Sequence, residues 1–64
     1  MKTLLRKIDE LAANIEMGIY AKSEAMLKIR ELRTEVSSKF QEGSDNFMMC
    51  IHSLIDAHDL AKEL

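Results

Sequence analysis

The chain has 64 residues, of which 47% are apolar and 31% charged, and a formal net charge of −2. These fractions are typical of one globular domain rather than a disordered segment, and the nine basic residues against eleven acidic ones exclude the basic surplus that phosphate binding requires. Cys50 is the only cysteine, which excludes an internal disulfide and favours a reducing environment.

The first predicted helix covers residues 2–17. Its apolar residues Leu4, Ile8, Leu11 and Ile15 recur at spacings of 4, 3 and 4, which places them on one helical face. Charged residues interrupt the apolar ones throughout, so the segment reads neither as a signal sequence nor as a membrane span. We therefore expect a cytoplasmic protein with no membrane contact. Gly18 occupies the position of a left-handed C-terminal cap, after which the chain folds back.

The second predicted helix covers residues 23–41. Ser23 is the expected N-cap, and Glu24 lies in the first turn, where the helix dipole favours a carboxylate. An apolar stripe follows, made of Ala25, Ile29, Leu32, Val36 and Phe40. If Leu32 lies in the core, its replacement by Ala costs ~2–4 kcal/mol.

A continuous first helix competes with this hairpin. The two stripes stay in phase across Gly18, and the resulting heptads have β-branched residues at one core position and leucines at the other, as in a parallel coiled coil. A single helix over residues 2–41 is about 60 Å long. Against it, the centre of the seam holds Gly18, Lys22 and Ala25 in succession, which pack weakly.

Residues 18–25, Gly-Ile-Tyr-Ala-Lys-Ser-Glu-Ala, resemble a turn of short bacterial helical hairpins with the form Gly-Ile-Ile-Thr-x-Glu-Glu-Phe, which also occurs in the short C-terminal domain of bacterial oligomeric proteins. Ala21 stands in place of the capping threonine of that pattern, and Ala25 in place of its aromatic residue. The resemblance implies a helical hairpin and no particular function.

The third predicted helix covers residues 45–63, after a capping Gly43 and the N-cap candidates Ser44, Asp45 and Asn46. The prediction is an all-α fold: three short helices form an antiparallel hairpin or small bundle that is completed by self-association, with the second helix as the middle layer. The residues assigned to the core or to self-association are Leu4, Ile8, Leu11, Ile15, Ile29, Leu32, Val36, Phe40, Phe47, Ile51, Leu54 and Ile55.

The sequence predicts no catalytic, cofactor-binding or metal-binding residues. His52, Asp56 and Asp59 share one side of the third helix, but three ligands from one helix make an incomplete metal site, and a solvated face is the simpler interpretation. His58 falls within the apolar arc, either as a space-filling side chain or as a pH-sensitive contact. Cys50 is expected to be a small apolar filler rather than a nucleophile.

The leading interpretation is a small non-enzymatic interaction protein of a bacterium or phage, acting as an adaptor, inhibitor or assembly factor. Its predicted partners are a second copy of itself, as a dimer, and an unidentified protein. Tyr20, Leu27 and Met49 lie off the core stripes and are expected to form a second contact surface. The alternative is a DNA-binding helix-turn-helix regulator, which the interspersed glutamates of the second helix and the acidic third helix argue against.

Overall fold

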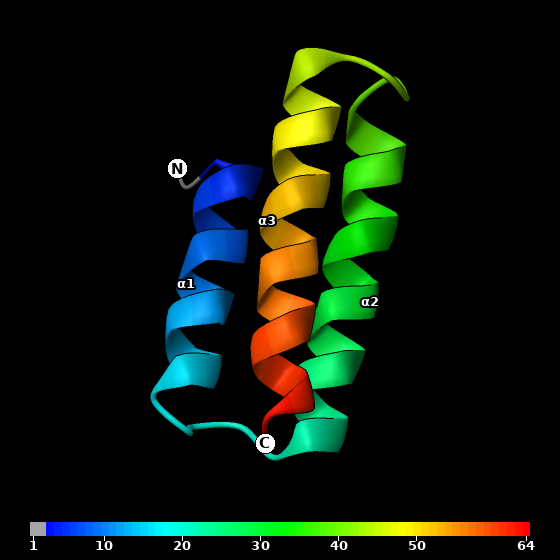
Figure 1. Cartoon of the computed structure of the whole chain (residues 1–64). Helices are drawn as coiled ribbons and strands as arrows, with labels where there is room; N and C mark the ends of the chain where they lie inside the picture. Colours follow the sequence, from blue (N-terminus) through cyan, green and yellow to red (C-terminus); the bar gives the residue numbers. More distant parts are fainter. Residues whose placement is uncertain (1–2) are drawn as a thin grey trace.

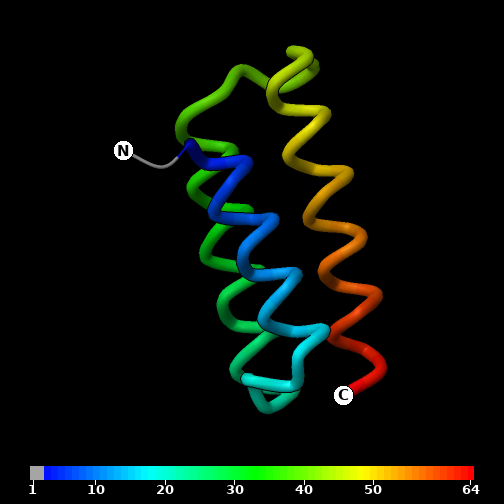
Figure 2. The backbone as a smooth tube through the Cα atoms, turned by 90° about the vertical axis from the view of Figure 1, so that its left-hand side faces the viewer, coloured from blue at the N-terminus to red at the C-terminus, as the bar shows by residue number. Residues whose placement is uncertain are grey.

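The computed structural model describes residues 3–64, which form three helices: α1 (Leu4–Glu16), α2 (Lys22–Lys39) and α3 (Asp45–Lys62). The helices alternate in direction, so α2 runs antiparallel to both of its neighbours (Figures 1 and 2). This confirms the predicted all-α fold of three helices. Residue 2, where the first helix was predicted to begin, lies outside the described residues; Thr3 is the N-cap of α1, and its hydroxyl accepts a hydrogen bond from the backbone N–H of Arg6 at 3.2 Å. None of the described helices is long and apolar enough to cross a membrane.

Gly18 separates α1 from α2. Its φ of +77° lies in the left-handed region, where a side chain is strained. The Gly18 N–H donates to the Ile15 carbonyl at 3.0 Å and the Ile19 N–H to the Asn14 carbonyl at 3.1 Å, which together make a Schellman motif. The predicted cap is therefore confirmed, and the continuous helix is wrong: the molecule measures 31 Å along its longest axis, whereas that helix alone is about 60 Å long.

α2 begins at Lys22, one residue earlier than predicted, and no side chain caps its N-terminus. The N-cap is Ala21, which makes no side-chain hydrogen bond, and the Ala25 N–H donates to its carbonyl at 2.9 Å. Ser23 lies inside the first turn, so the prediction that it caps the helix was wrong. Glu24 is in the first turn, as predicted. α2 thus begins without a capping side chain, at the position that matches the threonine of the hairpin pattern.

The connection between α2 and α3 is a turn rather than a glycine cap. α2 ends at Lys39, two residues earlier than predicted, because Phe40 is extended and packs against the core. Gly43, with φ +86°, is the third residue of a turn closed by a 3.1 Å hydrogen bond from the Ser44 N–H to the Gln41 carbonyl, which is a type II β-turn. The Ser44 hydroxyl accepts from the Phe47 N–H at 3.2 Å, so Ser44 is the N-cap of α3.

The central helix is α3. It packs extensively against both α1 and α2, whereas α1 and α2 contact each other much less (Figure 1 shows α3 between them). The prediction that the second helix is the middle layer was therefore wrong. The reason lies in side-chain size: three of the buried residues of α3 are Cys50, Ala57 and Ala61, and small side chains let two neighbouring helices approach one helix closely.

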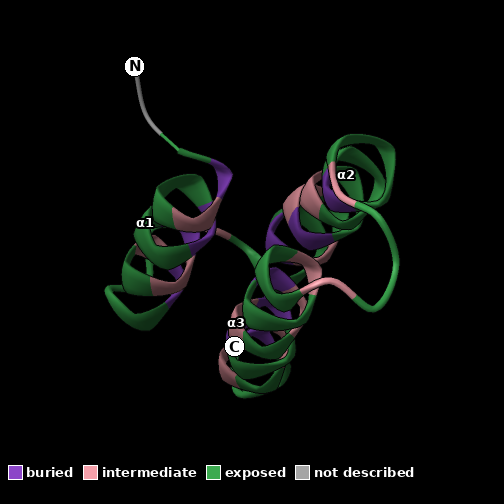
Figure 3. Cartoon of the chain, turned by 90° about the horizontal axis from the view of Figure 1, so that it is seen from above, coloured by how far each residue is buried: buried purple, intermediate pink, exposed green. Residues whose placement is uncertain are grey.

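The core fills the space between the three inner faces, as seen along the bundle in Figure 3. Most of the predicted core residues are buried or pack against it, with Leu32, Phe40, Phe47 and Ile51 partly buried. Ile55 is not in the core, because it lies on the flank of α3 and its side chain is 51% exposed. The buried residues in the described part of the chain are Leu4, Ile8, Leu11, Ile15, Ala25, Ile29, Val36, Cys50, Leu54, Ala57 and Ala61.

Candidate interaction surfaces

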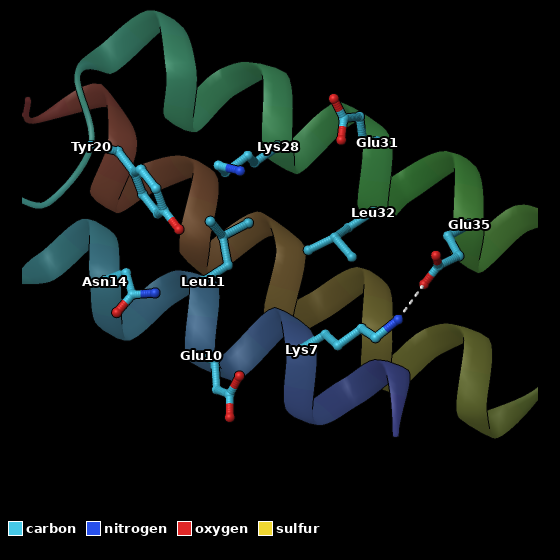
Figure 4. A pocket seen from close by; sticks show the side chains of 9 residues that line it. All are labelled: Lys7, Glu10, Leu11, Asn14, Tyr20, Lys28, Glu31, Leu32 and Glu35. Carbon is cyan, nitrogen blue, oxygen red and sulfur yellow. Dashed lines mark ion pairs between the residues drawn. The ribbon is translucent and has the colours of Figure 1, made fainter. Parts of the chain in front are cut away.

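A polar groove of about 310 Å³ separates α1 from α2 (Figure 4). Leu11 and Leu32 are its apolar members, and charged side chains line most of the rest. The Lys7 Nζ of α1 lies 3.7 Å from the Glu35 Oε2 of α2, and the two side chains are 49% and 48% exposed. The groove is therefore bridged by an ion pair rather than closed by apolar packing.

Tyr20 lies at the end of this α1/α2 groove nearest the connection between the two helices (Figure 4). The Lys28 Nζ lies 5.2 Å from the centroid of the Tyr20 ring, within the range of a cation–π interaction. Both side chains are half-buried. Tyr20 therefore makes an internal contact in addition to any contact with a partner.

The three residues predicted to form a contact surface, Tyr20, Leu27 and Met49, do not share one groove. Tyr20 lines the α1/α2 groove, whereas Met49 lines another groove of about 390 Å³ near the N-terminus of α3, together with Phe40 and Cys50. Leu27 is 55% exposed on α2 and lines neither of these grooves. No two of the three residues therefore line the same groove.

A third groove, of about 290 Å³, lies between α2 and α3 and is mostly apolar. Ile55, 51% exposed, lies at its rim, and Met48, 46% exposed, lies two turns earlier on the same flank of α3. We call the residues Met48, Ile51, Ile55 and His58, spaced by 3, 4 and 3, the α3 strip. The residues that line this groove are Ile29, Arg33, Ile51, Leu54, Ile55 and His58.

The charges of α2 are separated between its two flanks. Lys28, Glu31 and Glu35 line the α1/α2 groove, whereas Arg33 lines the α2/α3 groove. Arg30 precedes Arg33 by three residues, and the two therefore neighbour each other along the same flank. Within residues 3–64, Arg33 makes no ion pair, and no carboxylate lines the α2/α3 groove. This flank of α2 is basic.

The histidines of α3 lie in different surroundings. His58 is half-buried in the α2/α3 groove, whereas His52, Asp56 and Asp59 are exposed. The Asp59 Oδ1 is 3.9 Å from the Lys62 Nζ, one turn further along. In the described part of the chain, no three His, Cys, Asp or Glu side chains are grouped closely enough to hold a metal ion.

Cys50 is buried on the inner side of α3, as the sequence predicted for an apolar filler, and its side chain is 2% exposed. Burial raises the pKa of its thiol, the negative charge of Asp9 raises that pKa further, and the positive charge of Lys39 lowers it. A nucleophilic thiol needs the opposite change. This environment keeps Cys50 protonated.

Sequence reasoning missed Arg33 and Met48 as members of a possible contact surface. The signal for Met48 was present in the spacing of the α3 strip, which runs beside the buried stripe of the same helix. The signal for Arg33 was the placement of Arg30 and Arg33 off the flank that carries the glutamates. Neither signal identifies a surface until the neighbour of each helix is known.

No protein family model, curated protein or solved structure matches the chain.

Proposed function

We propose that this chain is a non-enzymatic protein-interaction module that binds its partner through the α3 strip. The observation that carries the proposal is the exposure of Ile55 and Met48 beside a groove that is mostly apolar. Burying a fully exposed side chain of this size contributes about 1.5–3 kcal/mol, and Ile55 and Met48, which are each about half exposed, have roughly half of that still to gain. Covering the strip therefore supplies a substantial part of a binding free energy, whereas leaving it in water gains nothing for the free protein.

The reactive side chains support a role in binding rather than catalysis. Cys50 is buried and its pKa is raised, and the exposed His52 lies away from the grooves described above. A buried free thiol also suits the reducing cytoplasm in which we propose that the protein acts.

Self-association stays a prediction, and its expected location changes. Most of the residues on which it was predicted pack inside one chain, whereas Ile55 is exposed. A dimer would have to form through exposed side chains instead.

The helix-turn-helix alternative has less support from the geometry. In that motif two helices meet at about 90–120° and the second enters the major groove of DNA. Here α2 and α3 lie side by side and antiparallel (Figures 1 and 2).

Photocrosslinking in cells of the source organism tests the proposed function. Benzoylphenylalanine at position 48 should form an adduct with another protein, whereas the same group at position 27, a similarly exposed site on α2, should not. Adding Ile55→Asp should abolish the adduct at position 48, with the helical circular dichroism signal retained because Ile55 is outside the core. Equal adducts at both positions, or an adduct insensitive to Ile55→Asp, would contradict the proposal.

A further inference from the structure

The face that includes the α2/α3 groove combines two parallel features. The α3 strip supplies apolar side chains, and α2 supplies Arg30 and Arg33 beside it. On the opposite flank of α2, Glu31 and Glu35 face α1. The apolar and basic rows therefore lie next to each other along one side of the bundle, with the carboxylates of α2 directed elsewhere.

Resting on the proposed function, we infer that the partner segment is an acidic amphipathic helix. Its apolar face covers the α3 strip, and its carboxylates lie along the flank next to α2. The α3 strip runs from Met48 to His58, eleven residues whose first and last Cα atoms lie about 15 Å apart along the helix axis. A docked helix that presents anchors at i, i+3, i+4 and i+7 spans about 10.5 Å between the first and the last anchor, so its anchors fit within the length of the strip.

The acidic character of the partner follows from Arg33. Its guanidinium makes no ion pair within the described chain, yet it lines the groove that the partner covers. Covering a charged side chain removes water from it, and leaving that charge unpaired is costly. A carboxylate on the partner compensates this loss, because a guanidinium donates two parallel hydrogen bonds to it. Arg30, one turn earlier, selects a second carboxylate three or four residues along the partner helix.

Two other occupants fit the same face less well. A second copy that docks isologously brings its own Arg30 and Arg33 to the contact, which adds like charges. An anionic membrane also attracts the arginines, but it is an extended flat surface, whereas the α3 strip borders a groove between two helices, which suits a single docked helix.

A displayed peptide library tests the inference. Each peptide is an 18-residue helix (about five turns) with leucines fixed at one face and Glu, Lys or Gln drawn equally at both flanks. Selection against the wild-type chain should enrich Glu on one flank. Arg33→Glu should weaken the selected peptides about tenfold or more and should itself select Lys at those positions. Arg6→Glu, the same charge change at an exposed site on α1, should leave binding unchanged.

The outcomes separate this inference from the proposed function. Binders that are lost with Ile55→Asp but show no preference for Glu would overturn the acidic partner and leave the interaction module standing. A library without any binder sensitive to Ile55→Asp would overturn the proposal that a helix occupies the groove. The proposed interaction module is tested separately, by photocrosslinking at position 48. A dimer seen by sedimentation and lost with Ile55→Asp would assign the face to a second copy. Binding to phosphatidylserine vesicles that Arg33→Glu abolishes, without enriched peptides, would assign it to a membrane.

Discussion

Lys7 of α1 and Glu35 of α2 form an ion pair across the α1/α2 groove, with Nζ and Oε2 3.7 Å apart. The pair spans the one helix–helix contact that α3 does not fill, since α1 and α2 touch each other much less than either touches α3. Leu11 and Leu32 lie in the same groove (Figure 4). The bundle is therefore built around α3, and its remaining contact is made largely by polar side chains.

The Lys7–Glu35 pair should contribute little to stability. Both side chains are about half exposed, and ion pairs of this kind contribute about 0.2–1 kcal/mol before screening by salt. A double-mutant cycle with Lys7→Ala and Glu35→Ala, measured by urea unfolding, should give a coupling free energy in that range. The coupling should fall in about 1 M salt, because the ions then screen exposed charges over only a few ångströms. A coupling above about 2 kcal/mol would mean that the groove is closed and dry.

Gly18→Ala should destabilise the protein by about 1–2 kcal/mol, because the left-handed backbone strains any residue with a Cβ. No atom lies within 4 Å of the added Cβ, so the cost is conformational rather than steric. The sign is diagnostic: in a continuous helix the same change would stabilise by about 1 kcal/mol. Urea unfolding measures it, and Gly43→Ala, at φ +86° with equally open surroundings, is the matched comparison.

Leu54→Ala should cost more than Leu32→Ala. Leu54 is 4% exposed on the central helix, so its truncation leaves a cavity and should cost about 2–5 kcal/mol. Leu32 is only partly buried and lines the α1/α2 groove, where water can occupy the vacated space. Its truncation should cost roughly half as much, below what its place on the stripe suggests. Equal free energies of unfolding for the two variants would show that α2 is buried as deeply as α3.

Cys50 should make stability fall at alkaline pH. The folded state holds the thiol pKa above its ordinary value of 9.0. The contribution of the protonated Cys50 thiol to the free energy of unfolding is therefore fully present below pH 9.0, and it is lost as the pH rises through the folded-state pKa. The difference in unfolding free energy between the wild type and Cys50→Ala should therefore shift against the wild type above pH 9.0. In parallel, iodoacetamide should alkylate the folded chain at pH 8 (about one pH unit below that value) much more slowly than the urea-unfolded chain.

The three helices, and the face that each of them buries, can be predicted from the sequence because both depend on the spacing of apolar residues within one segment. Leu4, Ile8, Leu11 and Ile15 recur at helical spacing, and all four are buried. The end of α1 at Gly18 can be predicted in the same way, since glycine is the residue that adopts the left-handed cap conformation at low cost. These features are encoded within a single helix or turn, so a single sequence suffices to predict them.

The choice of the central helix and the location of a contact surface are not local. Ala57 and Ala61 look like weak core residues in the sequence, yet their small size is what brings α3 between its neighbours. Ile55 shares the apolar arc with Leu54 and is nevertheless half exposed, because α2 covers one flank of α3 only in part. Tyr20, Leu27 and Met49 all lie off the stripes, but exposure alone does not place residues together.

Ala21→Thr should stabilise the protein by about 0.5–2 kcal/mol. Ala21 is the N-cap of α2, its backbone is already extended, and it offers no side-chain acceptor to the first turn. A threonine there would place Glu24 at the third helical position, which completes a capping box with reciprocal hydrogen bonds. Ser23→Ala, inside the first turn, should change the free energy of unfolding by only a few tenths of a kcal/mol (~0.3). If Ser23→Ala instead proves costly and Ala21→Thr neutral, the helix begins at Ser23 in solution and the cap assignment fails.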